Sequence, residues 1–150
     1  VLELQEPTDL SALLEWEGFA VDGNKDGHLG LGFETVTDAL KLDPLTDNEF
    51  ESLIARNALT GGALRSILPL KADGYFRAHL APQSGEFEAG FAIALVLNGS
   101  GSVTFANAPA MEIAQGDALV IPHAAGSYSI SGANVIVCRP PLAELARVAI

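Results

Sequence analysis

The chain has 150 residues, of which 49% are hydrophobic and 18% are charged, and its formal net charge is -11 at pH 7. This length and composition are typical of one globular domain, or of one domain with part of another, and exclude a disordered chain. The acidic balance and the absence of a basic stripe argue against nucleic acid as a partner, although a phosphorylated small molecule needs only a few local cations. No apolar run approaches the ~18 residues of a membrane-spanning helix and no signal segment is recognisable, so no membrane partner is expected.

The first 62 residues combine a strand pattern, a glycine-rich loop and two helical patterns. The opening "VLELQ" resembles a strand already in progress and has no initiator methionine, so we expect a piece of a longer protein. After the apolar stretch "LSALLEW" and the loop "DGNKDGHLGLGF", the stretch "ETVTDAL" predicts a helix that ends before Pro44. A second helix is predicted over "TDNEFESLIAR", where Thr46 and Glu49 have the spacing of a capping box. The pair Gly61-Gly62 ends this segment.

From residue 63 onward the pattern is that of a β-barrel. Short apolar runs alternate with turn signals at even spacing, and seven or eight strands in so short a stretch favour a closed barrel or jelly roll. The candidate strands are "ALRSILPL", "GYFRAHLA", "FEAGFAIALVLN", "SVTFA", "AMEIA", "DALVIP", "SYSIS" and "NVIVCRP", with "PQSG", "NGSGS" and "SGAN" among the predicted turns. The closing "PLAELARVAI" predicts a short helix packed on the barrel. We therefore expect a mainly β fold, with a barrel domain over residues 63–150 and a partly helical segment over residues 1–62 before it.

Two features that invite a functional assignment are better explained as scaffold. Asp22, Asn24 and Asp26 fit the first positions of an EF-hand loop, but its last position, where a bidentate glutamate belongs, is Phe33. A turn-rich loop is therefore favoured over a calcium site. The single cysteine, Cys138, lies in the apolar stretch "NVIVC" and cannot form an internal disulfide, which favours a buried thiol and a cytoplasmic protein.

The barrel segment resembles the cupins. "LVLNGSGSVTF" is similar to that family's strand-turn-strand with glycines at the hairpin, and "GDALVIP" is similar to the opening of its second motif. The positions of the family's metal ligands are occupied by residues that do not bind transition metals: Ala92, Ser127 and, approximately, Gly85 and Phe87. Such a site needs converging imidazole or carboxylate ligands, so we expect a barrel without metal. His79 and His123 are interpreted as a strand histidine and a turn histidine without a metal-binding role.

One acidic residue at the start of the chain is a candidate general acid/base. Glu3 alternates with Leu2 and Leu4 on the predicted strand, so its carboxylate faces away from them and shares a face with Gln5. A carboxylate that points into a barrel is able to move protons if its pKa suits the reaction. A polar strand face in water explains the same pattern equally well.

The order of motifs along the chain resembles that of type I mannose-6-phosphate isomerases. "VLELQEPTD" is similar to the E-I-Q-Q-x-S-D stretch of this family, "DGHLGLGFETVTDAL" to the loop and helix that follow it, and the degenerate barrel to its carboxy-terminal domain. The resemblance implies the carboxy-terminal part of such an enzyme. Its zinc cofactor would be held in an upstream catalytic barrel by ligands that precede residue 1, and this chain would hold no zinc. The family's reaction moves a proton between C1 and C2 of a sugar phosphate, which requires a base and a cation that polarises the carbonyl oxygen.

The resemblance also implies roles for individual residues. Glu3 matches the strand glutamate near the zinc, a candidate catalytic acid/base, and Asp9 matches the aspartate of the same motif. The family's active-site arginine falls at Leu13, which neither stabilises an enediolate nor binds phosphate. His28 matches the loop histidine and is a candidate substrate-binding residue. The cations available to replace the arginine are Lys25, also a candidate substrate-binding residue, Arg56, Arg65 and Lys71.

Two functions from different classes remain open. The first is the carboxy-terminal segment of an aldose-ketose isomerase that converts mannose 6-phosphate to fructose 6-phosphate and is inactive without its upstream barrel. The second is a metal-free, cupin-like carbohydrate-binding or regulatory module, in which Leu13 reflects lost catalysis. The upstream sequence separates them, because the isomerase needs a histidine shortly before Val1 and a paired metal-ligand motif further upstream.

Overall fold

The computed structural model describes residues 2–5, 11–40, 42–54 and 64–142. The chain divides into two compact units, Val1–Thr46 and Asp47–Ile150, which we call the amino-terminal and carboxy-terminal units. The helices are α1 (Gly23–Asp26) and α2 (Phe33–Thr37) in the first unit and α3 (Asp47–Ser52) in the second. The domain boundary predicted between residues 62 and 63 lies outside the described residues and stays a prediction.

A small aromatic cluster organises the amino-terminal unit. The indole of Trp16 stacks on Phe33, with ring centroids 5.6 Å apart and 18° between the ring planes. Trp16 also covers Gly23, where any Cβ atom would overlap the indole. The backbone N–H of Leu13 donates to the carbonyl oxygen of Gly27 at 2.8 Å, which closes the loop onto the segment before the tryptophan. The glycine at position 23 is therefore required by packing under an indole, and "DGNKDG" forms the helical turn α1.

Both predicted helices are confirmed, in shortened form. α2 overlaps the stretch "ETVTDAL", and the hydroxyl of Thr37 donates to the carbonyl oxygen of Phe33 at 2.7 Å. Such side-chain bonds compete with the helical ladder, and α2 ends at this residue. α3 lies within "TDNEFESLIAR" and ends at Ser52, whose hydroxyl donates to the carbonyl oxygen of Glu49 at 2.6 Å. The strand predicted at residues 1–5 is not formed over the described residues 2–5, where no partner strand completes a ladder.

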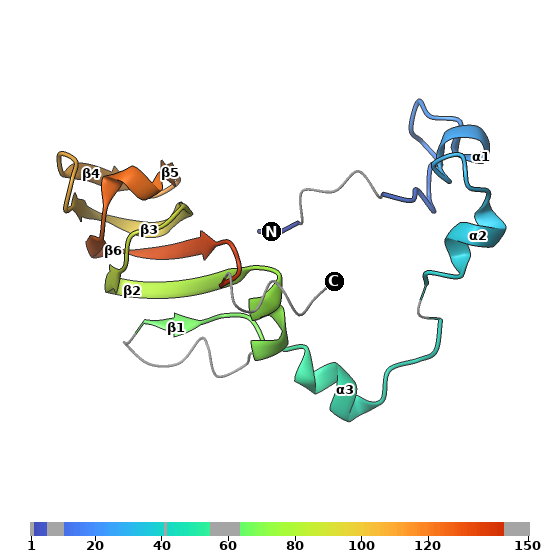
Figure 1. The fold of residues 1–150 in the computed structure, drawn as a ribbon, viewed down its shortest axis with the longest axis horizontal. Helices are drawn as coiled ribbons and strands as arrows, with labels where there is room; N and C mark the ends of the chain where they lie inside the picture. The colour runs from blue at the N-terminus through green and yellow to red at the C-terminus, as the bar shows by residue number, and fades with distance from the viewer. Residues whose placement is uncertain (1, 6–10, 41, 55–63, 143–150) are drawn as a thin grey trace. The chain divides into compact units, whose positions relative to one another are not determined.

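The carboxy-terminal unit is built on one six-stranded antiparallel sheet (Figure 1). Its strands are β1 (Arg65–Ser66), β2 (Arg77–Phe87), β3 (Ala92–Phe105), β4 (Met111–Ala114), β5 (Ala118–Ile121) and β6 (Tyr128–Arg139), with short 3-10 helices η2 (Leu70–Gly74) and η3 (His123–Ala125). The order across the sheet is β1-β2-β6-β3-β4, and β5 pairs with the first part of β3 while β4 pairs with a later part. The three long strands β2, β6 and β3 therefore form the centre of the sheet.

Three of the predicted turns are wrong, because the strands run through them. β2 continues through "PQSG", β3 through "NGSGS" and β6 through "SGAN". The ladders shift register at these points, between Pro82 and Ser84 and between Gly99 and Ser102. Gln83 adopts a left-handed conformation with a φ of 64°. Glycine and proline thus mark bulges inside long strands, which let a sheet curve around a core, and the predicted eight strands become six.

The hydrophobic core of this unit lies on the inner face of the curved sheet. Small and β-branched side chains dominate it, and the largest fully buried ones are Ile121, Ile130, Val96, Val103, Val135 and Val137. Asn134 stabilises the bulges: its amide donates to Oδ1 of Asn98 at 2.7 Å, and its own Oδ1 accepts from the backbone N–H of Gln83 at 3.0 Å. A single side chain of β6 therefore contacts the irregular points of both neighbouring strands.

The fold class predicted from the sequence is confirmed. The chain is mainly β, its sheet is antiparallel, and short helices precede the sheet. The helix predicted at residues 141–150 lies outside the described residues from position 143 onward. Over the part of the chain that the structure describes, no helix has the length and apolar character needed to span a bilayer.

Candidate functional site

Glu3, the predicted acid/base, is exposed and belongs to the segment 2–5. Its Oε1 accepts a hydrogen bond from Nε2 of Gln5 at 2.9 Å, so the two side chains share a face as the alternation predicts. Asp9, which follows in the same motif, lies outside the described residues. The catalytic role of Glu3 therefore stays a prediction, with one carboxylate oxygen bonded to an amide.

His28, the predicted loop histidine, is half-buried and held from two sides. Its Nδ1 accepts the backbone N–H of Gly32 at 3.2 Å, and its ring meets Phe33 edge-on at 5.2 Å and 86°. Because Nδ1 accepts, the neutral imidazole carries its proton on Nε2. Lys25 is exposed in the last turn of α1, in the same loop region. No hydrogen bond among the described residues joins Glu3 to either of these side chains.

The other cations considered for the missing arginine lie elsewhere. Arg65 belongs to β1 and Lys71 to η2, both in the carboxy-terminal unit. Arg56 lies outside the described residues. Leu13 uses its backbone N–H to hold Gly27, and 37% of its side chain is exposed. Of the substitutes, Lys25 is the described residue that shares a unit with Glu3 and His28.

The positions that correspond to cupin metal ligands do not fit a metal ion. Ala92 and Phe87 are buried apolar residues, and Gly85 has no side chain to donate. Ser127 is exposed just before β6. Within the described residues there is no group of three or more His, Cys, Asp and Glu side chains arranged to hold a metal ion.

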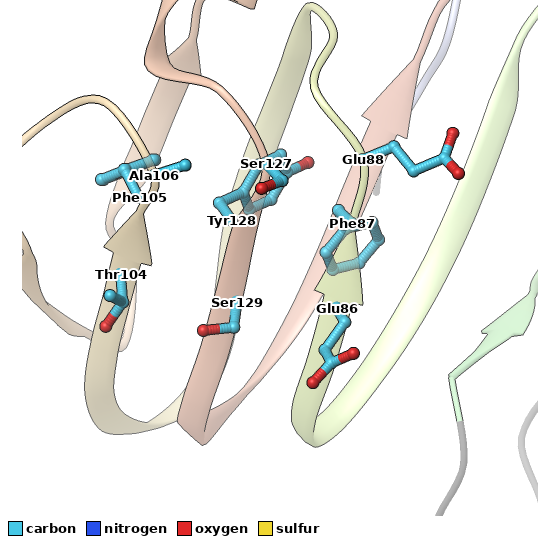
Figure 2. Close-up of a pocket in the computed structure, with 9 residues that line it drawn as sticks. All are labelled: Glu86, Phe87, Glu88, Thr104, Phe105, Ala106, Ser127, Tyr128 and Ser129. Carbon is cyan, nitrogen blue, oxygen red and sulfur yellow. The ribbon is translucent and has the colours of Figure 1, made fainter.

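A groove of about 540 Å³ lies where the end of β2, the start of β6 and the end of β3 run side by side (Figure 2). Strand pairing sets its residues in rows, because Phe87 is opposite Tyr128 and Tyr128 is opposite Phe105, with a polar row next to them. The lining consists of Glu86, Phe87, Glu88, Thr104, Phe105, Ala106, Ser127, Tyr128 and Ser129.

Three aromatic rings from the same strands pack on the buried face of the sheet, opposite to the exposed row of Glu86, Ser129 and Thr104. Phe87 and Tyr128 are stacked with centroids 5.0 Å apart and 14° between their planes, and Phe105 lies 6.1 Å from Tyr128 at 43°. Phe87 and Tyr128 are 7% and 3% exposed, so both rings are packed in the core. Aromatic pairs of this kind contribute about 0.5–1.5 kcal/mol beyond the burial of their area.

The polar lining determines which ligands suit the groove. Glu86 and Glu88 supply carboxylate acceptors, and the hydroxyls of Thr104, Ser127 and Ser129 both donate and accept. None of the lining residues carries a positive charge. The groove is therefore suited to a neutral, hydroxyl-rich molecule, and the two carboxylates oppose a phosphate group.

The sequence contains one signal of this groove. In "GEFEAG" the carboxylates alternate with Phe87, which is the pattern of a strand with one polar and one buried face. The pattern does not reveal that Ser129 and Thr104 lie beside Glu86, because those neighbours come from the pairing of three strands far apart in the chain.

Comparison with known proteins gives distant structural neighbours only. No protein-family model and no curated protein sequence matches the chain. The protein NMB1881 from Neisseria meningitidis is 18% identical with a TM-score of 0.41, over 57% of this chain and 92% of that one. A cupin-2 domain containing protein from Shewanella frigidimarina is 17% identical with a TM-score of 0.40, over 64% and 93% of the two chains.

Mannose 6-phosphate isomerase from Bacillus subtilis is 18% identical with a TM-score of 0.40, over 53% of this chain and 26% of that enzyme. The aligned part is thus about a quarter of the length of the enzyme. At such identities the likeness concerns the β fold alone, and neither an activity nor a ligand follows from it.

Proposed function

We propose that this chain is the carboxy-terminal part of a sugar-phosphate aldose-ketose isomerase resembling mannose-6-phosphate isomerase. One observation carries the proposal: the motifs "LELQEPTD", "DGHLGLGFETVTDAL" and "GDALVIPHAAGSYSISG" follow each other in the order of that family over nearly the whole chain. The substrate is then mannose 6-phosphate and the product fructose 6-phosphate. The upstream catalytic barrel of the same protein is the partner, and it holds the zinc.

Within this proposal Glu3 moves the proton between C1 and C2. The amide of Gln5 occupies Oε1 of Glu3, which orients the carboxylate and leaves Oε2 as the oxygen without that bond. General acid-base catalysis by a positioned carboxylate contributes about 10²–10⁴ in rate. His28 and Lys25 bind the sugar phosphate: Gly32 and Phe33 fix the imidazole so that Nε2–H is its donor, and the exposed ammonium supplies positive charge.

The experiment uses the full-length protein encoded by the parent gene. Conversion of mannose 6-phosphate is measured for the wild type, for Glu3→Gln and for the matched control Glu17→Gln, which removes an exposed carboxylate of the same unit. We expect Glu3→Gln to lower kcat by about 10²-fold or more at unchanged zinc content, and the control to retain activity. A wild-type protein that binds zinc and does not isomerise the substrate would overturn the proposal, as would an upstream sequence without metal ligands.

A second function is favoured by the groove on the carboxy-terminal unit. A metal-free carbohydrate-binding module needs hydroxyl and carboxylate groups that hydrogen-bond to sugar hydroxyls, and Glu86, Thr104 and Ser129 provide these in the groove. The proposed ligand is a neutral hexose.

Binding to this groove is tested by NMR titration of the 150-residue chain with mannose. Shifts at Thr104 and Ser129 are expected, with affinity several-fold weaker in Glu86→Gln, because a charge-assisted hydrogen bond is lost. Glu112→Gln, an exposed carboxylate on β4, is the control. If mannose leaves the groove resonances unmoved, the binding function is wrong, whatever the isomerase assay gives.

A further inference from the structure

Two arginines face each other where β2 begins and β6 ends. Arg77 and Arg139 are register partners on these neighbouring strands. His79 lies two residues further along β2, opposite Val137, so the three basic side chains share one face of the sheet. That face is the inner one, because Val137 and, one pair further on, Ala81 are fully buried in the core.

Tyr128, at the other end of β6, reaches the same region because the strands bend. Nη2 of Arg139 donates to the carbonyl oxygens of residues 88 and 89 at 3.1 and 3.3 Å, so the guanidinium lies against the turn that follows Phe87. The ring of Phe87 contacts both His79 and Tyr128, with centroids 6.5 Å from the imidazole and 5.0 Å from the phenol. We call Arg77, His79, Tyr128 and Arg139 the arginine cluster.

The arginine cluster holds three buried polar atoms that have no hydrogen-bond partner in the described structure. These are Nδ1 of His79, the hydroxyl oxygen of Tyr128 and Nε of Arg139. Buried polar groups are nearly always bonded in native proteins, so such a set indicates an acceptor that occupies the region. Burial raises the pKa of Tyr128 to about 12, which keeps its hydroxyl a donor.

We propose that the arginine cluster binds a small oxyanion, namely a phosphate group. Nε–H of Arg139 and O–H of Tyr128 donate to its oxygens, and the second guanidinium adds positive charge. Nε of Arg77 donates to the carbonyl oxygen of Pro140 at 3.0 Å. This proposal stands apart from the isomerase proposal; the arginine cluster shares Tyr128 with the groove, but its cations are not among the groove-lining residues.

Two carboxylates near the arginine cluster compete with such a ligand. Burial, followed by the charge of Arg139, lowers the pKa of Arg77, and Asp73 on η2 and Glu88 oppose this effect. Asp73 also opposes the lowering of the pKa of His79. Burial, followed by the charges of Arg77 and Arg139, lowers the pKa of His79 below its ordinary value. A bound phosphate reverses this effect, because an anion stabilises the imidazolium. Removal of the charge of Asp73 is expected to strengthen phosphate binding.

The test is a titration of the 150-residue chain with inorganic phosphate at constant ionic strength. Isothermal calorimetry measures affinity, and NMR follows the imidazole of His79, assigned with His79→Gln. We expect saturable binding and a rise in the pKa of His79. Mannose 6-phosphate and mannose form the other two arms. If mannose 6-phosphate binds more tightly than inorganic phosphate, the phosphate group comes from an ester; if the two bind equally, the ligand is free phosphate. Mannose should leave the pKa of His79 unchanged.

The variants are chosen so that the fold is preserved. Tyr128→Phe keeps the ring stack and removes only the hydroxyl, and it should weaken phosphate binding about tenfold, since a hydrogen bond to a charged group is lost. Arg77→Gln should weaken it at least as much, Asp73→Asn should strengthen it, and Lys71→Gln, an exposed cation on η2, should leave it unchanged.

Arg139→Gln is avoided as the main test because Arg139 also holds the turn at residues 88 and 89. Two outcomes would show that the arginine cluster is not an anion site. One is the absence of saturable phosphate binding to the folded wild type, and the other is a phosphate affinity in Tyr128→Phe and Arg77→Gln equal to that of the wild type.

Discussion

At the scale of single residues, Tyr128 occupies two contrasting environments. Its ring is 3% exposed and stacked on Phe87, which favours burial, while its hydroxyl is buried without a hydrogen-bond partner in the described structure. An unsatisfied buried hydroxyl costs about 1–3 kcal/mol, a large part of the stability of a small domain. Donation of this hydroxyl to an oxyanion between two guanidinium groups is the use that we propose.

The first prediction concerns the alkaline stability of the fold. Burial raises the pKa of Tyr128 from about 10 to about 12, against a smaller opposing effect of Arg139. The folded state therefore holds this proton more tightly than the unfolded state. The contribution of this difference to the free energy of unfolding is complete below pH 10 and is lost as the pH rises through 12. We expect the free energy of unfolding of the wild type to fall by about 2 kcal/mol over this interval and that of Tyr128→Phe to escape this fall. Urea unfolding at successive pH values measures both.

Tyr75→Phe, which removes an exposed phenol, provides the comparison for this series. If it flattens the alkaline limb as much as Tyr128→Phe does, the assignment to Tyr128 is wrong.

Only part of the candidate chemistry is recognisable from single residues. The sequence predicts a catalytic role for Glu3 and substrate-binding roles for Lys25 and His28, and the structure describes these residues without testing their roles. The groove and the arginine cluster escaped sequence analysis because their members come from different strands. Arg77 and Arg139 are far apart in the chain, and only the pairing of β2 with β6 makes them neighbours.

At the scale of elements, the prediction succeeded where a segment follows local preference. The short helices α2 and α3 and the strands β4 and β5 lie within or overlap the predicted stretches, because apolar periodicity and turn residues act locally. The long strands were divided incorrectly at glycine and proline. These residues permit sharp backbone bends, and whether a bend ends a strand or curves it depends on the partner strand, which the local pattern does not contain.

A glycine comparison tests the interpretation of "NGSGS" as a bend in β3. A Cβ atom at Gly101 would collide with the carbonyl oxygen of Ser131 on β6, whereas one at Gly116 would meet open space at a φ of +91°. Gly101→Ala should cost about 2–4 kcal/mol, since two paired backbones must separate. Gly116→Ala should cost only the strain of about 1–2 kcal/mol that a left-handed alanine carries.

Chemical denaturation with far-UV circular dichroism measures both costs. Equal destabilisation by the two substitutions would indicate that "NGSGS" is a free hairpin turn.

At the scale of the whole molecule, the two units differ in how much core they possess. Among the described residues, Val36 is the buried hydrophobic side chain of the amino-terminal unit, and the remaining buried hydrophobics belong to the carboxy-terminal unit. Burial of apolar area contributes about 25 cal/mol per Å², so the amino-terminal unit has little to set against its loss of conformational entropy. It relies on the stack of Trp16 on Phe33 instead.

This difference predicts that the chain unfolds in two steps, with the amino-terminal unit first. The single tryptophan, Trp16, reports on that unit by fluorescence, while far-UV circular dichroism reports on the sheet. We expect the fluorescence transition at a clearly lower urea concentration, because independent cores give transitions that do not coincide. Gly23→Ala, which forces a methyl group into the indole of Trp16, should move the fluorescence transition alone. Coincident transitions that both move in this variant would mean that the two units unfold as one cooperative structure.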